Sequence, residues 1–142
     1  MKRVLIAAGL AAFLLIPSVR AEDSLYKQLG GYDGIAAVTD SILVKLVNHP
    51  SLGRFFKGHS VSSGTKTRQM IVDFICASSG GPCAYTGRSM LDAHAGLKIT
   101  EQDWSDAMSL SGTAMTELKV DPAVQAKVGD FMGTLKADIV GH

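Results

Sequence analysis

The chain has 142 residues, with 14 Lys and Arg against 13 Asp and Glu, and 46% of its residues are hydrophobic. This length supports one domain with a substantial core but is small for two. The near-neutral balance of charge argues against a strongly basic surface of the kind that binds nucleic acid.

The first 21 residues have the pattern of a secretory signal peptide. Lys2 and Arg3 precede an apolar run over residues 4–16, Pro17 follows it, and Ala21 ends a small-residue cleavage motif. A membrane anchor is the alternative, but a run of about 13 apolar residues is shorter than the roughly 20 that span a bilayer. We therefore expect residues 1–21 to be removed.

Cleavage would leave a mature domain of residues 22–142 that is periplasmic or secreted. Lys2, Arg3 and Arg20 leave with the signal peptide, so 11 basic residues remain against 13 acidic ones, a net charge of about −2. We expect no nucleic-acid partner and, because no later stretch is apolar enough, no membrane span after cleavage.

The mature chain predicts an all-α fold. Apolar residues recur every three or four positions, and no segment alternates with the period of two that is typical of strands. The expected helices are a lead-in over 22–29, a helix over 35–48 with Asp33 as its cap, a helix from Ser62 or Ser63 to Gly80, a short turn from Ser89 through His94, a helix over 100–118 and a last helix over 121–139. Between the second and third lies a short aromatic segment, Leu52 to Phe56.

His94 has the most apolar surroundings of the four histidines, between Met90 and Leu91 on one side and Leu97 and Ile99 on the other. An isolated histidine in such a position is more often a hydrogen-bonded core residue. A neutral imidazole among aliphatic and thioether side chains also suits an iron ligand in an apolar cofactor pocket.

Other metal chemistries fit poorly. Cys76, Cys83 and His94 match no usual zinc-ligand spacing and leave a fourth ligand unnamed. Covalent c-type haem attachment requires Cys-x-x-Cys-His, which the chain lacks. A non-covalent cofactor pocket remains the best explanation of the apolar excess.

Several motifs, taken together and in order, resemble the group 1 truncated haemoglobins. They are Leu-Gly-Gly at 29–31, Phe-Phe at 55–56, Gly-Gly-Pro at 80–82, Tyr-Thr-Gly-Arg at 85–88 and Met-x-x-x-His-x-x-Leu-x-Ile at 90–99. The resemblance covers about residues 25–140. It implies a truncated globin, a two-over-two helical sandwich that holds haem b (iron protoporphyrin IX).

The resemblance also implies roles for individual residues. His94 aligns with the proximal iron ligand and Phe56 with the aromatic residue that stacks on the haem, while the pocket wall would comprise Met90, Leu97, Ile99 and Trp104. The backbone carbonyl of Met90 could hold the other ring nitrogen of His94. Arg68 or Arg88 is a candidate partner for a haem propionate.

The chain departs from the family on the distal side. Leu43 stands where many members carry a tyrosine, and Thr67, Met70 and Ile71 occupy the distal helix where glutamine or histidine is often found. The distal pocket is therefore expected to be nearly apolar, which weakens any transfer of strong oxygen retention or nitric oxide dioxygenase activity.

The main hypothesis is a binding protein for a diatomic gas, O2, NO or CO, on iron held by His94. The alternatives are a haem-dependent enzyme that detoxifies nitric oxide or peroxide with a reductase partner, an electron-transfer protein in which Met70 or His59 is a sixth ligand, and a helical scaffold without a cofactor.

Cys76 and Cys83 flank Gly-Gly-Pro in a chain that is expected to be exported, which predicts a disulfide between them. On a continuous helix the two residues would lie about 10.5 Å apart, too far for a bridge, so the glycines must turn the chain back. Two buried free thiols are the alternative.

Overall fold

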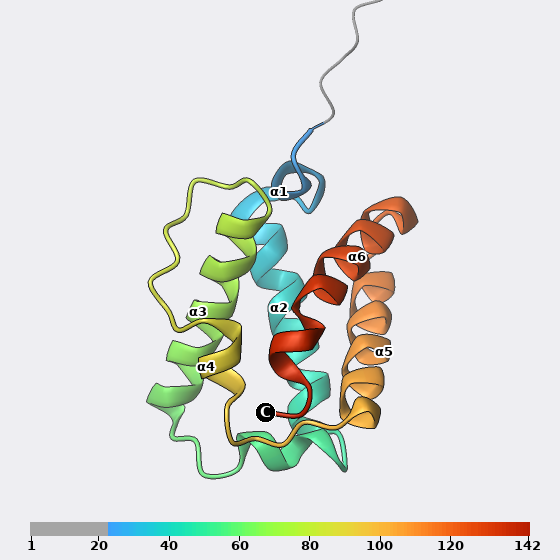
Figure 1. The fold of residues 1–142 in the computed structure, drawn as a ribbon. Coiled ribbons are helices and arrows are strands. Elements are labelled where there is room, and N and C mark those ends of the chain that lie inside the picture. The colour runs from blue at the N-terminus through green and yellow to red at the C-terminus, as the bar shows by residue number, and fades with distance from the viewer. Residues whose placement is uncertain (1–22) are drawn as a thin grey trace, which may run out of the picture.

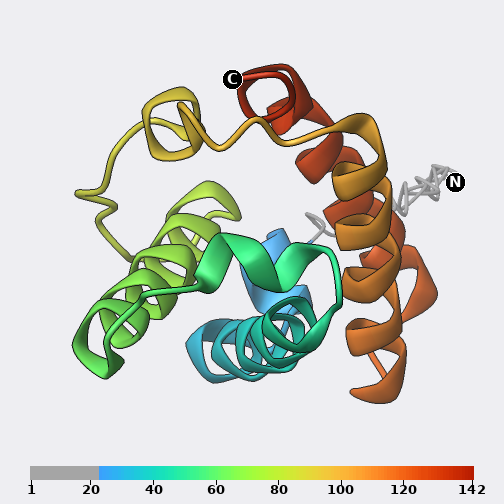
Figure 2. The same ribbon diagram turned by 90° about the horizontal axis from the view of Figure 1, so that it is seen from below.

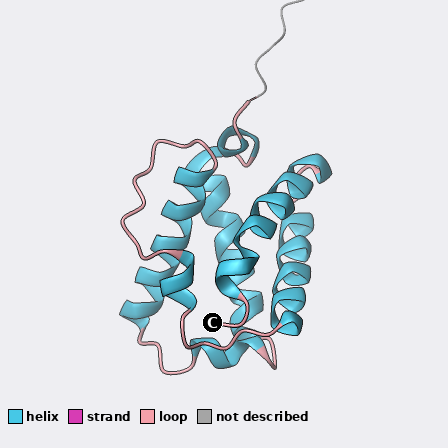
Figure 3. Cartoon of the chain, in the orientation of Figure 1, coloured by secondary structure: helices cyan, strands magenta, loops and turns pink. Residues whose placement is uncertain are grey.

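The computed structural model describes residues 23–142, so the predicted signal peptide lies outside the described residues. Figure 1 and Figure 3 show that this part of the chain consists of helices joined by loops, without a strand, as the sequence predicted. The elements are α1 (Leu25–Gln28), α2 (Gly31–Asn48), the 3-10 helix η1 (Leu52–Phe56), α3 (Val61–Ser78), α4 (Met90–His94), α5 (Glu101–Glu117) and α6 (Pro122–Ile139).

The four long helices form two pairs. Helix α2 packs against α3, α5 packs against α6, and the pairs meet mainly where α2 contacts α5. Figure 2 shows the pairs at an angle to each other, with η1 crossing the end of α2 and the short α4 lying near the end of α6. This arrangement is the predicted two-over-two helical sandwich.

Side-chain caps fix the starts of α4, α5 and α6, where the sequence predicted these helices to begin. The hydroxyl of Ser89 accepts a hydrogen bond from the third residue of α4. Thr100 and Asp103 form a reciprocal capping box at the start of α5, and Asp121 caps α6 ahead of Pro122. Each cap satisfies backbone N–H groups that have no partner within the helix.

Helix α2 begins four residues earlier than the sequence suggested. Gly30 adopts a left-handed conformation with φ of 86°, and the helix starts directly after it at Gly31. Asp33 is therefore not the cap but lies in the first turn, where a carboxylate is favoured by the helix dipole.

Helix α3 also begins earlier than expected. Its cap is Ser60, whose Oγ accepts a hydrogen bond from the backbone N–H of Ser63 at 3.1 Å, so the prediction of Ser62 or Ser63 as the cap is wrong. The loop between η1 and α3 is correspondingly short.

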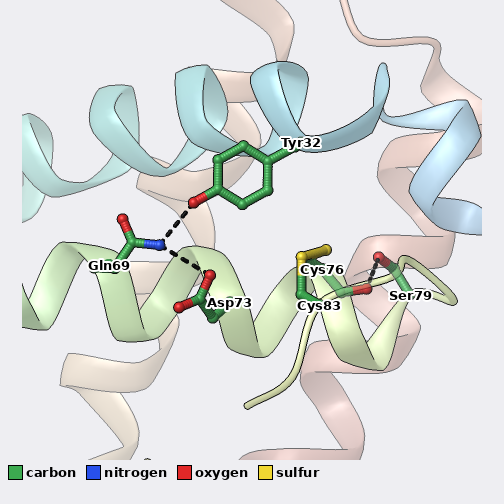
Figure 4. The surroundings of a disulfide bond; sticks show 6 residues. All are labelled: Tyr32, Gln69, Asp73, Cys76, Ser79 and Cys83. Carbon is green, nitrogen blue, oxygen red and sulfur yellow. Dashed lines mark hydrogen bonds between the residues drawn. A yellow bond between two sulfur atoms is a disulfide. The ribbon is translucent and has the colours of Figure 1, made fainter. Parts of the chain in front are cut away.

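The main cluster of buried hydrophobic residues lies at the end of the molecule near α1. It comprises Leu29, Ile35, Val72, Cys76 and Val124. The predicted disulfide between Cys76 and Cys83 forms here, with 5.7 Å between the two Cα atoms (Figure 4). A Cβ atom on Gly81 would lie 2.7 Å from the Sγ of Cys76, so only glycine fits where the chain turns back.

Within residues 23–142, no helix combines the length and hydropathy that crossing a membrane requires.

Candidate functional site

A large, mainly apolar cavity of about 1000 Å³ lies among α2, η1, α3, α4, α5 and α6. This volume is at the upper end of the range, about 300 to 1000 Å³, that encloses small organic ligands and cofactors. The residues that the sequence analysis assigned to a cofactor pocket all line it: Leu43, Phe56, Thr67, Met70, Ile71, Met90, His94, Leu97, Ile99 and Trp104.

His94 is half-buried in the cavity wall and is oriented by its own helix. Its Nδ1 atom lies 2.8 Å from the backbone carbonyl oxygen of Met90, which can only accept a hydrogen bond. In the neutral ring, Nδ1 is therefore the nitrogen that carries the proton, and Nε2 is the nitrogen with the lone pair. A neutral imidazole fixed in this tautomer is the form that binds a metal ion.

The side of the cavity formed by α2 and α3 offers few polar groups. Leu43, Met70 and Ile71 present aliphatic or thioether side chains, and Thr67 contributes one hydroxyl. Thr39, one helical turn before Leu43, is 2% exposed and also lines the cavity, and its Oγ1 has no hydrogen-bond partner among the described residues. The sequence analysis missed Thr39, although its spacing of four from Leu43 places both residues on one helix face.

Two cationic side chains line the cavity, Lys66 of α3 and Arg88 of the loop before α4. The sequence analysis named Arg88 but missed Lys66. The other predicted arginine, Arg68, does not line the cavity. Its guanidinium instead donates two hydrogen bonds, of 2.7 and 2.8 Å, to the carboxylate of Asp40, which lowers the pKa of that carboxyl.

Asp103 is the buried acid of the cavity wall and connects η1 to α5. Its carboxylate accepts hydrogen bonds from the guanidinium of Arg54 at 2.6 Å and from the backbone N–H of Thr100 at 2.9 Å. These bonds hold the pKa of Asp103 well below its usual range, against the opposing effect of burial. The guanidinium of Arg54 also lies 4.2 Å from the centre of the Phe55 ring, so the same network orients the aromatic segment.

These features fit a haem. The cavity is apolar and large, a half-buried histidine in its wall has Nδ1 held by a backbone carbonyl, and two cations at the wall can receive the carboxylates of a porphyrin.

Comparison with known proteins identifies relatives over most of the chain. The family model of the bacterial-like globins matches residues 24–140. A group 1 truncated haemoglobin of Tetrahymena pyriformis is 25% identical over 118 residues, which are 83% of this chain and 95% of that protein. The group 1 truncated haemoglobin GlbN of Mycolicibacterium paratuberculosis is 34% identical over 77 residues, 54% of each chain.

Solved structures share the fold. The truncated haemoglobin of Tetrahymena pyriformis in its Fe(III) form superposes with a TM-score of 0.77 at 22% identity, covering 84% of this chain and all of that one. The 2/2 haemoglobin of a Synechococcus species, in the cyanomet state and with covalently attached haem, gives a TM-score of 0.75 at 23% identity, covering 83% and 98%. The chain is thus similar to group 1 truncated haemoglobins and has the truncated 2/2 globin fold, and it belongs to the bacterial-like globin family, whose members carry haem.

Proposed function

We propose that the mature chain is a periplasmic or secreted protein that holds haem b through His94 and reversibly binds a diatomic gas, O2, NO or CO. The observation that carries this proposal is the hydrogen bond between Nδ1 of His94 and the Met90 carbonyl, which leaves Nε2 available in the cavity wall. Bound haem would supply an iron with one coordination position left for the gas.

The remaining residues would position the cofactor. Phe56 of η1 and Trp104 of α5 both provide aromatic surface in the wall. Lys66 and Arg88 would pair with the two propionates, because a cation lining an apolar cavity is stabilised by an anionic partner. Among residues 23–142, neither Lys66 nor Arg88 forms an ion pair with an aspartate or glutamate.

The residues of α2 and α3 favour weak retention of oxygen. Bound oxygen carries partial negative charge and gains from a hydrogen-bond donor in a low-dielectric pocket, whereas carbon monoxide gains little. Leu43 and Ile71 cannot donate, and Thr67 is the one hydroxyl among the predicted distal residues. A gas-binding role with fast oxygen release is therefore favoured over dioxygenase chemistry.

Export is proposed from the pattern of residues 1–21 and is supported by the disulfide. Disulfides persist in oxidising compartments such as the periplasm and are rare in the cytosol. Fractionation of cells that express the full chain, followed by measurement of the N-terminal residue of the mature protein, tests this part of the proposal.

The role of His94 is tested by replacing histidines one at a time. His94→Gly should lose haem during purification, and added imidazole should restore the Soret absorption band by filling the space left by the side chain. His49→Gly is the matched control, because His49 lies outside this cavity. Haem retained by His94→Gly but lost by His59→Gly would contradict the proposal and assign the iron to His59, which also lines the cavity.

A further inference from the structure

Helix α4, which carries His94, has little of its own to fix its position. It has five residues, Met90 to His94, and none of them is fully buried. A helix this short is not stable by itself in water. Among the described helices, α4 makes its substantial contacts with α6. The position of His94 must therefore depend on what holds this region against the end of α6.

The segment that follows His94 is irregular but contributes to the cavity. Residues 95–99 form neither helix nor strand, and Leu97 and Ile99 line the cavity. Lys98 has a φ of 51°, a left-handed conformation that is costly for a residue with a side chain. A residue persists in such a conformation only where its surroundings impose it.

The last two residues of the chain supply that constraint. The backbone N–H of Lys98 donates a hydrogen bond to the backbone carboxylate oxygen of His142 at 2.6 Å, and the N–H of Gly141 donates one to the carbonyl oxygen of Ile99 at 2.9 Å. Figure 1 and Figure 2 both show the C-terminus beside the connection from α4 to α5. We call these two hydrogen bonds the C-terminal bridge.

The C-terminal bridge is itself anchored on α6. Nε2 of His142 lies within hydrogen-bond distance, 3.0 Å, of the carbonyl oxygen of Ala137 in the last turn of that helix. Ile139, the last residue of α6, is 7% exposed and lines the cavity. The bridge thus connects a buried helix end to the segment directly after His94.

We infer that Gly141 and His142 are positioning residues for the proximal histidine: through the bridge to Lys98 and Ile99 they set where the His94 ring lies in the cavity. This inference rests on the proposed function of His94 as the iron ligand. It assigns the last two residues a role in cofactor geometry that the sequence analysis did not foresee.

The inference predicts that loosening the bridge alters the bond between His94 and iron. In the ferrous haem-bound protein, a chain shortened to end at Val140 should show a shifted or broadened iron–histidine stretching band. It should also transfer haem to excess apomyoglobin at least about tenfold faster, because both hydrogen bonds of the C-terminal bridge are lost.

A milder variant guards against a failure to fold. Gly141 has a φ of 86°, and a methyl group added there would meet no atom within 4 Å, so Gly141→Ala strains the backbone without a clash. The matched control is Gly30→Ala, at the same φ of 86° with only an ordinary 3.5 Å contact, near α1 and away from His94. We expect Gly141→Ala to shift the band in the same direction as the shortened chain, and Gly30→Ala to leave it unchanged.

Two outcomes would overturn the inference. One is an unchanged stretching band and an unchanged rate of haem transfer in both the shortened chain and Gly141→Ala, with helix content intact by circular dichroism. The other is an equal shift in Gly30→Ala, which would indicate general destabilisation. Retention of haem by His94→Gly would instead refute the proposed function itself, so the two failures are distinguishable.

Discussion

Replacing Asp103 with asparagine removes one negative charge from the wall of the cavity while preserving the size of the side chain. In the wild type the carboxylate is 4% exposed and accepts hydrogen bonds from Arg54, Ser51, the backbone N–H of Thr100 and the hydroxyl of Thr100. Asparagine keeps one acceptor oxygen, which can still serve Thr100, but it carries no negative charge and cannot form the ion pair with Arg54.

The cost can be estimated from the bonds that change. A hydrogen bond to a charged group contributes about 1.5 to 3 kcal/mol and a neutral one about 0.5 to 1.5 kcal/mol, so the loss of charge assistance costs about 1 to 1.5 kcal/mol. The lost carboxylate also interacts with the helix dipole in the first turn of α5, contributing about 0.5 kcal/mol. Asp103→Asn should therefore lower the free energy of unfolding by about 2 kcal/mol.

Glu101→Gln is the matched control, because it makes the same chemical change in the same helical turn. Glu101 pairs with Lys136 at 2.6 Å, but its side chain is 72% exposed. Exposed ion pairs contribute about 0 to 1 kcal/mol. Urea unfolding of the wild type and both variants, all in the same cofactor state, measures the difference; equal losses in the two variants would refute the reasoning.

The effect of Asp103→Asn should also depend on pH. Because the folded structure lowers the pKa of Asp103, its contribution to stability is complete above the ordinary carboxyl value of about 3.9 and is lost as the pH falls through that value toward the lower folded-state pKa. Asparagine does not titrate at these pH values. The stability gap between wild type and variant should thus be constant from pH 5 to 7, values above the ordinary pKa, and narrow in stronger acid.

Three further predictions concern single sites. Without reduction, neither Cys76 nor Cys83 should react with an alkylating reagent, and mass spectrometry should find two modified thiols only after reduction and unfolding; modification of the unreduced protein would exclude the bridge. Thr39→Val should leave the free energy of unfolding, measured with urea, unchanged or raise it by up to about 1 kcal/mol, because the hydroxyl has no partner to lose; a clear loss of stability would reveal an unrecognised bond. Leu43→Tyr should slow oxygen dissociation about tenfold in stopped-flow measurements, with Leu43→Phe unchanged, since only tyrosine adds a donor; equal rates in all three proteins would show that the pocket does not need one.

The helices were predictable where their signals are local. The capping box of Thr100 and Asp103 and the Asp121-Pro122 start each depend on residues within one turn, and the structure contains both. The predicted start of α3 was wrong because the serines at positions 60, 62 and 63 can all act as helix caps. Which of these serines becomes the cap depends on the path of the chain after η1, and the local sequence does not determine that path.

The cavity was predictable only in part. The family resemblance located His94 and its neighbours, but the choice between Arg68 and Arg88 depends on a partner, Asp40, that lies 28 residues from Arg68 along the chain. Lys66 lines the cavity only once α3 is packed in place, and His142 contacts Lys98 and Ala137 only in the folded structure. Such long-range information is absent from periodicity and capping patterns.

The placement of the buried core at the α1 end has a consequence for hydrogen exchange. Around Cys76, side chains from α2, α3 and α6 pack together and the disulfide closes the turn after α3. At the opposite end, η1 contributes one fully buried residue, Leu52, and α4 contributes none. We expect backbone amides near Cys76 to exchange only on global unfolding, whereas those of η1 and α4 open locally at a much lower free energy. A cofactor that binds only when η1 and α4 are closed would slow exchange of their amides, and more so the more tightly it binds. The stability of the η1 and α4 end would therefore depend on haem far more than the stability of the end around Cys76.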